Sequence, residues 1–145
     1  MAGENAIGGQ RLFAGVVGTQ VVKVCDIVVA RTGLLADEAK TAGYDPVTTM
    51  ITTWDHKVYY PGAHELHLSL TADWSTQRIL GVQLLGAWGS EIAKRIDIVA
   101  TALYHELRVE HLNNLDLSYT PPLSSPWDPI QMLAQAWMAQ TRLVN

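Results

Sequence analysis

The sequence has little of what usually classifies a small protein. One cysteine in 145 residues excludes an internal disulfide, a cysteine-based zinc finger and a CxxC redox pair. No apolar run reaches the roughly 18 to 20 residues of a membrane span, and the start resembles no signal peptide. Charged residues make up 17% and the net charge is −4, so no basic surface is expected for nucleic acid or an anionic membrane. We therefore expect a soluble, cytoplasmic domain that binds neither.

The residues that are abundant indicate one folded domain. Hydrophobic residues make up 48% of the chain, too many for a disordered segment, and 145 residues can bury a sizeable core without disulfides. Five tryptophans accompany a single phenylalanine. Large amphipathic rings with few charges are typical of buried interfaces, although tryptophans that fill the core would give the same composition.

Strands are predicted mainly in the first half of the chain. Residues 19–31 are β-branched and almost continuously apolar, which is typical of a strand covered on both faces. Cys25 falls inside this run, so we expect a buried and inert thiol. Shorter β-branched or alternating runs predict three more strands, the last two joined as a hairpin: 47–54, 64–74 and 78–87.

Helices are predicted mainly in the second half. Residues 90–107 have apolar side chains at helical spacing, with Ser90 as the N-cap and Glu91 in the first turn. Other segments with helical signals are 34–42, 109–115 and 127–143. Because strands and helices are segregated along the chain, the sequence predicts an α+β fold: an antiparallel sheet with helices packed on one face.

Few residues suggest chemistry by themselves. His64 and His67 would point to opposite faces of a strand, and the His105 and His111 spacing does not fit HExxH, so no metal site is expected. The proline-containing loop 116–129 is rigid and carries a tyrosine between two helices. Rigid loops on a scaffold often hold binding groups, but a plain helix connection explains the same residues.

Six short motifs follow one another along the chain, at residues 18–34, 60–63, 79–83, 94–97, 115–117 and 119–124. Together they resemble the C-terminal dimerisation domain of the flavin-dependent pyridine nucleotide–disulfide oxidoreductases. The branch they resemble most contains the coenzyme A-disulfide reductases and NADH oxidases/peroxidases. Tyr119 and the prolines after it stand where the glutathione reductase branch has a His-Pro-Thr pattern, and Cys25 stands where the family usually has phenylalanine.

The resemblance implies an organisation and a function. Residues 1–10 look like the end of the last helix of a preceding FAD domain, and residues 11–145 look like the dimerisation domain. The parent enzyme would use FAD and NAD(P)H. Their glycine-rich fingerprints are missing from this chain, so the fragment is expected to bind no cofactor and to be inactive alone. It would pair as a homodimer, with Tyr119 and Tyr60 completing the partner subunit's site for coenzyme A or a small disulfide or peroxide.

A second hypothesis assigns the chain to another class. A free-standing α+β binding or regulatory module without redox activity could share this fold. Such a module would need a helix start at its N-terminus and a complete pocket within one chain. The first residues instead look like a helix end stopped by Gly8 and Gly9, which favours the reductase domain.

Overall fold

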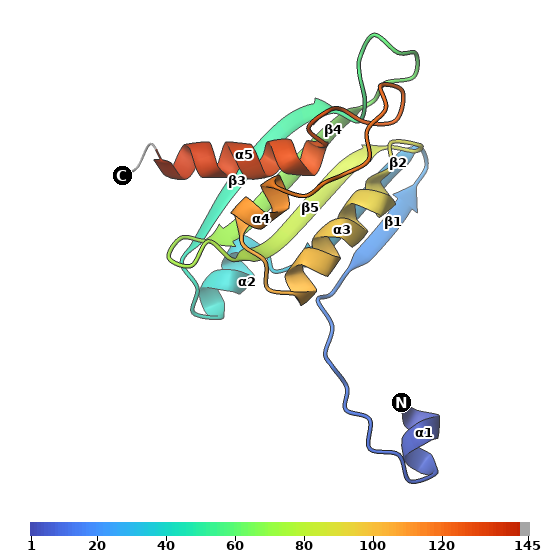
Figure 1. Cartoon of the computed structure of the whole chain (residues 1–145), viewed down its shortest axis with the longest axis vertical. Helices are drawn as coiled ribbons and strands as arrows, with labels where there is room; N and C mark the ends of the chain where they lie inside the picture. Colours follow the sequence, from blue (N-terminus) through green and yellow to red (C-terminus); the bar gives the residue numbers. More distant parts are fainter. Residues whose placement is uncertain (143–145) are drawn as a thin grey trace.

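A five-stranded antiparallel sheet forms the centre of the structure, a computed structural model that describes residues 1–142 (Figure 1). The strands are β1 (Gln20–Val24), β2 (Ile27–Gly33), β3 (Pro46–Trp54), β4 (Glu65–Asp73) and β5 (Ile79–Ala87). The helices are α1 (Ala2–Ala6), α2 (Ala36–Thr41), α3 (Ile92–Tyr104), α4 (Val109–Asn113) and α5 (Pro129–Arg142). The strand order is β1-β2-β5-β4-β3. The predicted α+β class is confirmed.

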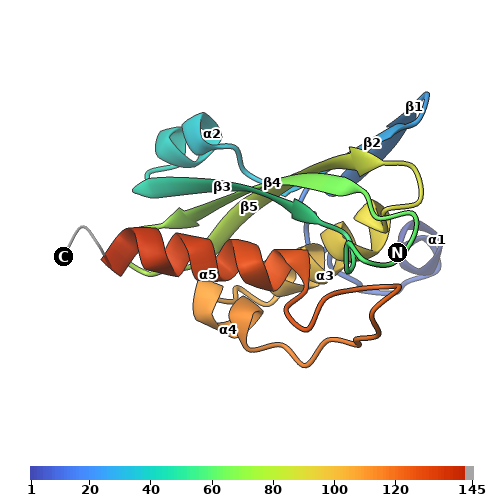
Figure 2. The ribbon, with the colours of Figure 1, turned by 90° about the horizontal axis from the view of Figure 1, so that it is seen from above.

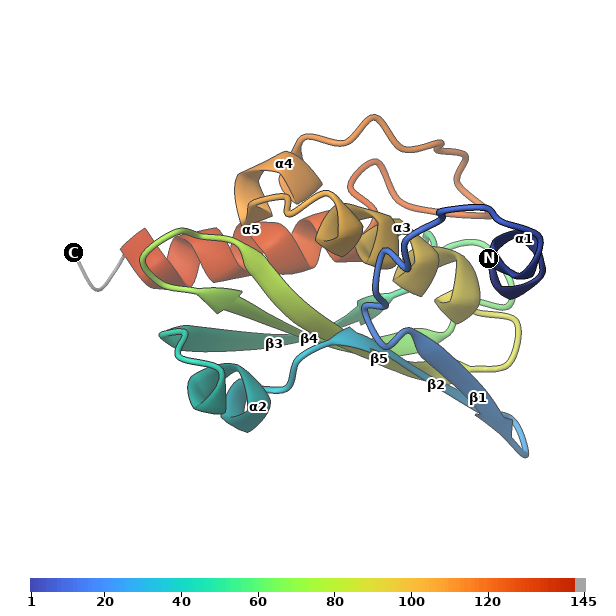
Figure 3. The ribbon, with the colours of Figure 1, turned by 90° about the horizontal axis from the view of Figure 1, so that it is seen from below.

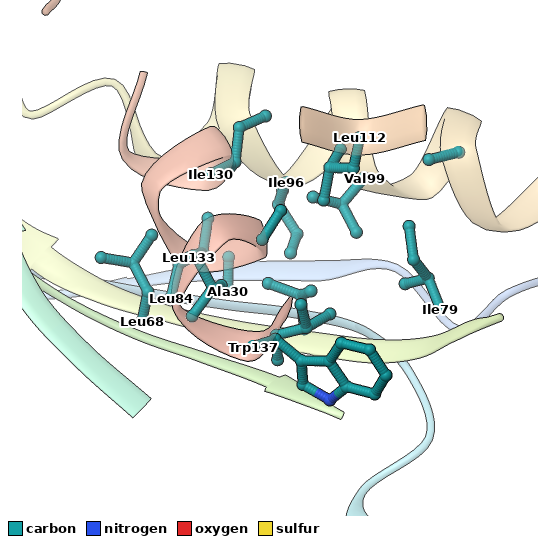
Figure 4. Close-up of a cluster of buried hydrophobic side chains, with 14 of the residues drawn as sticks. Ala30, Leu68, Ile79, Leu84, Ile96, Val99, Leu112, Ile130, Leu133 and Trp137 are labelled. Carbon is teal, nitrogen blue, oxygen red and sulfur yellow. The ribbon is translucent and has the colours of Figure 1, made fainter. Parts of the chain in front are cut away.

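Helices α3, α4 and α5 cover one face of the sheet, whereas the short α2 lies on the opposite side (Figures 2 and 3). The core fills the space between the sheet and these three helices (Figure 4). Its largest member is Trp137 of α5, whose indole N–H donates a hydrogen bond to the Val47 carbonyl at 2.9 Å. A buried tryptophan needs such a partner for its N–H, so this bond also fixes α5 against β3.

Strands β4 and β5 form the predicted hairpin at the centre of the core. The alternating leucines of β4 (Leu66, Leu68 and Leu70) are each 2% exposed or less. Leu68 is the register partner of Leu84, and Leu70 that of Val82, so apolar side chains of both strands face the helices. Alternation with period two places these residues on one face, which is why the sequence predicted them correctly.

The prediction of a single strand over residues 19–31, covered on both faces, is wrong. The run folds back on itself as the β1–β2 hairpin, with its turn at Cys25 and Asp26. Cys25 is exposed and has a φ of 49°, so it is neither buried nor inside a strand. Every residue of β1 is exposed. An apolar run does not distinguish one long strand from two short ones, because a tight turn can be made without glycine or proline.

The predicted start of the helix over residues 90–107 is also wrong. Ser90 does not cap it: its hydroxyl donates to the Ala87 carbonyl at 2.6 Å. Helix α3 begins at Ile92, and Glu91 stands at the N-cap with a φ of 58°. The helix ends at Tyr104. The apolar spacing correctly predicted the buried face of α3. It did not predict the N-terminus, because Ser90 belongs to the tight turn after β5 and does not cap the helix.

Helix α1 and the segment after it extend away from the rest of the chain (Figure 1). No residue of α1 is buried, and Leu12 and Val16 are 90% and 81% exposed. The chain joins the sheet at Val17, whose carbonyl accepts the Gly33 N–H at 2.7 Å. At the other end α5 follows the helix predicted over 127–143, of which Leu143 lies outside the described residues. Within residues 1–142 no helix is long and apolar enough to cross a membrane.

Candidate functional site

Two loops that carry tyrosines meet at one end of the sheet. The first tyrosine loop, residues 55–64, joins β3 to β4, and the second, residues 117–128, joins α4 to α5. The Lys57 N–H donates a hydrogen bond to the Pro121 carbonyl at 3.2 Å, so the loops are in direct contact. In Figure 1 they form the green and the orange-red excursions at the upper right. The two candidate residues Tyr60 and Tyr119 are therefore carried by neighbouring loops, 59 positions apart in the sequence.

A third tyrosine connects the two candidates. The rings of Tyr59 and Tyr60 have centroids 5.1 Å apart. Partial desolvation raises the pKa of Tyr59, and the neighbouring phenols of Tyr119 and Tyr60 raise it further. Tyr60 and Tyr119 are 38% and 46% exposed, so both rings are partly packed and partly accessible from outside. Tyr59 was not among the predicted site residues, although two adjacent tyrosines directly before a Pro-Gly pair were a usable signal.

The neck of the first tyrosine loop is closed by Asp55. Its N–H donates to the His64 carbonyl at 3.0 Å, and its Oδ1 accepts the His64 N–H at 2.9 Å. The same oxygen lies 2.9 Å from Nδ1 of His56. Both carboxylate and histidine are buried. Asp55 thus contacts both His56 and His64. Residues 1–142 contain no group of three or more histidine, cysteine, aspartate and glutamate residues able to hold a metal.

The second tyrosine loop is ordered by its own hydrogen bonds. The amides of Leu123 and Ser124 both donate to the Thr120 carbonyl, at 2.9 and 3.0 Å, which makes a turn directly after Tyr119. Asp128 ends the loop and caps α5, since its Oδ1 accepts the Ile130 N–H at 3.1 Å. The segment that the sequence left undecided is therefore a fixed support for Tyr119.

A cleft of about 310 Å³ lies near the bases of the two loops. Trp54 and Lys57 line it from the first loop side, and Pro126 and Trp127 line it from the second. Both tryptophans are about half exposed, at 44% and 53%. Flat rings and a lysine ammonium can contact a ligand that has a planar group and a negative charge.

Arg95 is a buried charge that the sequence analysis did not single out. Its side chain is 0% exposed, and its Nε lies 3.2 Å from each carboxylate oxygen of Asp128. The signal was present, because Arg95 falls on the apolar face of the predicted helix beside Ile96. A charged residue at a core position requires a buried partner.

The outer face of the sheet, opposite α3–α5, carries a set of exposed apolar side chains among polar ones. Exposed side chains on the strands of this face are Val22, Val24, Ile27, Val29, Met50 and Leu85. A groove of about 370 Å³ runs across it between β2, β5, β4 and β3. An apolar surface of this extent is typical of an interaction site. Of the five tryptophans, Trp137 fills the core, Trp74 is partly buried, and Trp54, Trp88 and Trp127 are exposed.

An antiparallel sheet with one helical layer, an apolar outer face and two tyrosine loops at one end defines an α+β domain built for association. Residues 19–129 match the family described as pyridine nucleotide-disulphide oxidoreductase, dimerisation domain. The chain belongs to this family.

Similar proteins agree with this assignment. The NAD(P)H sulfur oxidoreductase (CoA-dependent) of Pyrococcus abyssi is 40% identical over 135 residues, which are 93% of this chain and 30% of that protein. The coenzyme A disulfide reductase of Staphylococcus aureus is 36% identical over 121 residues, 83% of this chain and 27% of the relative. Among solved structures, a NAD-dependent persulfide reductase from A. fulgidus is 37% identical, with a TM-score of 0.91 over 98% of this chain and 26% of that one. The chain thus spans about 30% of the length of the first of these relatives.

Proposed function

We propose that this chain is the dimerisation domain of an FAD-dependent, NAD(P)H-using oxidoreductase that reduces a coenzyme A disulfide or persulfide. The observation that carries the proposal is the meeting of the two tyrosine loops, with Tyr60 and Tyr119 partly exposed at one end of the domain. The names of the similar proteins, a CoA-dependent sulfur oxidoreductase and a coenzyme A disulfide reductase, support the substrate class. The likeness to a water-forming NADH oxidase is at 22% identity and supports the fold alone. Nothing in the structure or the comparisons favours the free-standing module.

The tyrosines would act on the site of the partner subunit. A phenol can donate a hydrogen bond to a developing thiolate and can supply a proton to a leaving thiol. Pro121 and Pro122 follow Tyr119 after a single residue, Thr120, whose carbonyl accepts the amides of the following turn. The loop is thus held in place, so the hydroxyl need not be ordered at each turnover. The cleft beside Trp54 and Lys57 offers a ring and a cation to a phosphate-bearing thiol such as coenzyme A.

FAD and NAD(P)H would bind to other parts of the parent enzyme. The chain contains neither glycine-rich fingerprint, so its own residues would supply the phenols and the dimer contact, and the cofactors would supply hydride chemistry. Residues 1–10 would complete the last helix of the FAD domain, which fits the absence of buried residues in α1. The apolar outer face supports a homodimer. A cytoplasmic location goes with this proposal, because that compartment keeps thiols reduced.

The test is Tyr119→Phe in the full-length flavoprotein, which keeps the ring and removes the hydroxyl. Loss of a general acid should lower turnover of coenzyme A disulfide by roughly 10²-fold, with flavin content and dimer mass unchanged. Tyr104→Phe is the matched control, because Tyr104 is 59% exposed at the end of α3, away from both loops. Full turnover in Tyr119→Phe would show that this hydroxyl has no catalytic role.

A further inference from the structure

One buried guanidinium joins the bases of both tyrosine loops. Nη2 of Arg95 donates to the Asp55 carbonyl at 2.8 Å, at the neck of the first loop. Its Nε donates to both oxygens of Asp128, each at 3.2 Å, at the end of the second loop. Its Nη1 donates to the Ser90 carbonyl at 2.7 Å, just before α3. Three segments that are far apart in the sequence are thus fixed to one planar group.

The attachments to Asp128 and Asp55 each continue toward a tyrosine. Asp128 accepts the Ser124 hydroxyl at 3.1 Å, and the Ser124 amide closes the turn on Thr120, next to Tyr119. On the other side, Asp55 closes the first loop on His64, and the Tyr60 N–H donates to the Lys57 carbonyl at 2.9 Å. Hydrogen bonds and short stretches of backbone therefore link Arg95 to the residues that carry the two phenols.

Burial makes this arrangement rigid. The Arg95 side chain is 0% exposed and that of Asp128 is 4% exposed. A charged group in such surroundings has no water to replace a lost partner, so departure from the observed geometry is strongly unfavourable. Lysine would keep the charge but could not reach all three acceptors, because its ammonium lacks the fixed planar fork of arginine.

We propose that Arg95 is a positioning residue that sets the distance and orientation between Tyr60 and Tyr119. This inference rests on the proposed function of the tyrosines. A phenol displaced by about 1 Å from its reacting sulfur can lose much of its effect on the rate, so a residue that fixes both loops controls turnover without touching substrate. The Lys57–Pro121 hydrogen bond joins the loops directly, and the Arg95 side chain adds a buried attachment at the neck of each loop.

The first measurement is amide hydrogen exchange on this chain and on Arg95→Lys. We expect the Lys57 and Ser124 amides, one in each loop, to exchange about tenfold faster or more in the variant, while β4 and β5 stay protected. Arg78→Lys is the matched control, because Arg78 pairs with Glu106 at the surface and contacts neither loop. Unchanged exchange in both loops, or equal acceleration across the whole sheet, would overturn the proposal.

The second measurement is a double-mutant cycle in the full-length flavoprotein. Arg95→Lys should lower kcat about tenfold with the flavin content unchanged, but in the Tyr119→Phe background the same change should cost less than about twofold. Additive losses would mean that Arg95 acts independently of Tyr119, which would contradict a positioning role.

Two further precautions keep the outcomes separate. If Arg95→Lys does not fold, the double variant Arg95→Met with Asp128→Asn takes its place. It removes both buried charges and keeps a side-chain oxygen to cap α5. We expect the same faster exchange in both loops, with β4 and β5 still protected. If Tyr119→Phe alone retains full turnover, the proposed function fails. The exchange measurement then still decides whether Arg95 holds the two loops together.

Discussion

The carboxylate of Asp73, at the end of β4, gives the sharpest prediction about stability. It is 3% exposed and accepts four hydrogen bonds. The donors are the Thr76 hydroxyl at 2.6 Å, the Ser75 hydroxyl at 2.7 Å, and the Asp45 and Thr76 amides at 2.9 Å each. Burial by itself raises the pKa of Asp73, but these hydrogen bonds outweigh it and lower the pKa from 3.8 to about 2.

The lowered pKa converts into a pH-dependent stability. A carboxyl group with a folded-state pKa below its unfolded value stabilises the fold above the unfolded pKa, and this contribution disappears as pH falls through the folded pKa. The shift corresponds to about 2 kcal/mol at pH 6, about 1 kcal/mol at pH 3 and less than about 0.5 kcal/mol at pH 2. Most of the loss therefore falls between about pH 4 and pH 2.

The assay is urea unfolding of this chain and of Asp73→Asn at pH 6, 4, 3 and 2. We expect the variant to be less stable by about 2 kcal/mol at pH 6 and the difference to shrink to a few tenths of a kcal/mol at pH 2. Asp116→Asn, at an exposed position in the second half, is the control and should show no such trend. A stability difference that stays constant from pH 6 to pH 2 would refute the argument, because it would show that the charge of Asp73 is irrelevant to the turn.

Three further outcomes are expected. Leu68→Ala, at a core position 2% exposed, should lower the free energy of unfolding by about 2 to 5 kcal/mol in urea titrations, whereas an unchanged midpoint would mean that the β4 leucines are not packed as described. Purified chain should scatter light as a dimer of the 15.9 kDa protomer at tens of micromolar, and Met50→Asp on the outer face should shift it to monomer; a wild-type monomer would argue against that face as the interface. A flavin-free preparation should be colourless and should not oxidise NADH, so measurable turnover would contradict the assignment of the cofactors to other parts of the enzyme.

The sequence predicted the parts of this fold that repeat a local pattern. Alternation in β4 and helical spacing in α3 each determine a buried face, and both faces lie where expected. Cys25 was misplaced because its turn uses a positive φ at a residue that carries no turn signal. Ser90 was misassigned because its hydroxyl donates to the Ala87 carbonyl in the tight turn after β5 and its carbonyl accepts from the Arg95 side chain, so the residue belongs to the turn and not to the helix.

The sequence led to two candidate tyrosines, whose catalytic roles stay predictions, but not to the contacts that hold their loops. Motifs led to Tyr60 and Tyr119, and the structure places their loops in contact. Asp55 and Asp128 stand 73 positions apart, and no periodicity relates them, so their shared attachment to Arg95 could not be inferred from spacing. Buried ion pairs between distant segments depend on how elements pack, and a single sequence carries no direct record of that.

The exposed strand β1 also has a consequence for handling the chain. It is an edge strand with one neighbour, so a row of its backbone amides and carbonyls is left unpaired, and its side chains are uncovered on both faces. Residues 20–29 contain only two charges, those of Lys23 and Asp26, and are rich in valine. Such a segment is a template for strand addition, and a preparation at high concentration will self-associate edge to edge unless a partner covers it. Val22→Lys would place a second lysine on β1 and oppose this edge-to-edge association. The same change would put a charge on the outer face, where we expect a partner to bind.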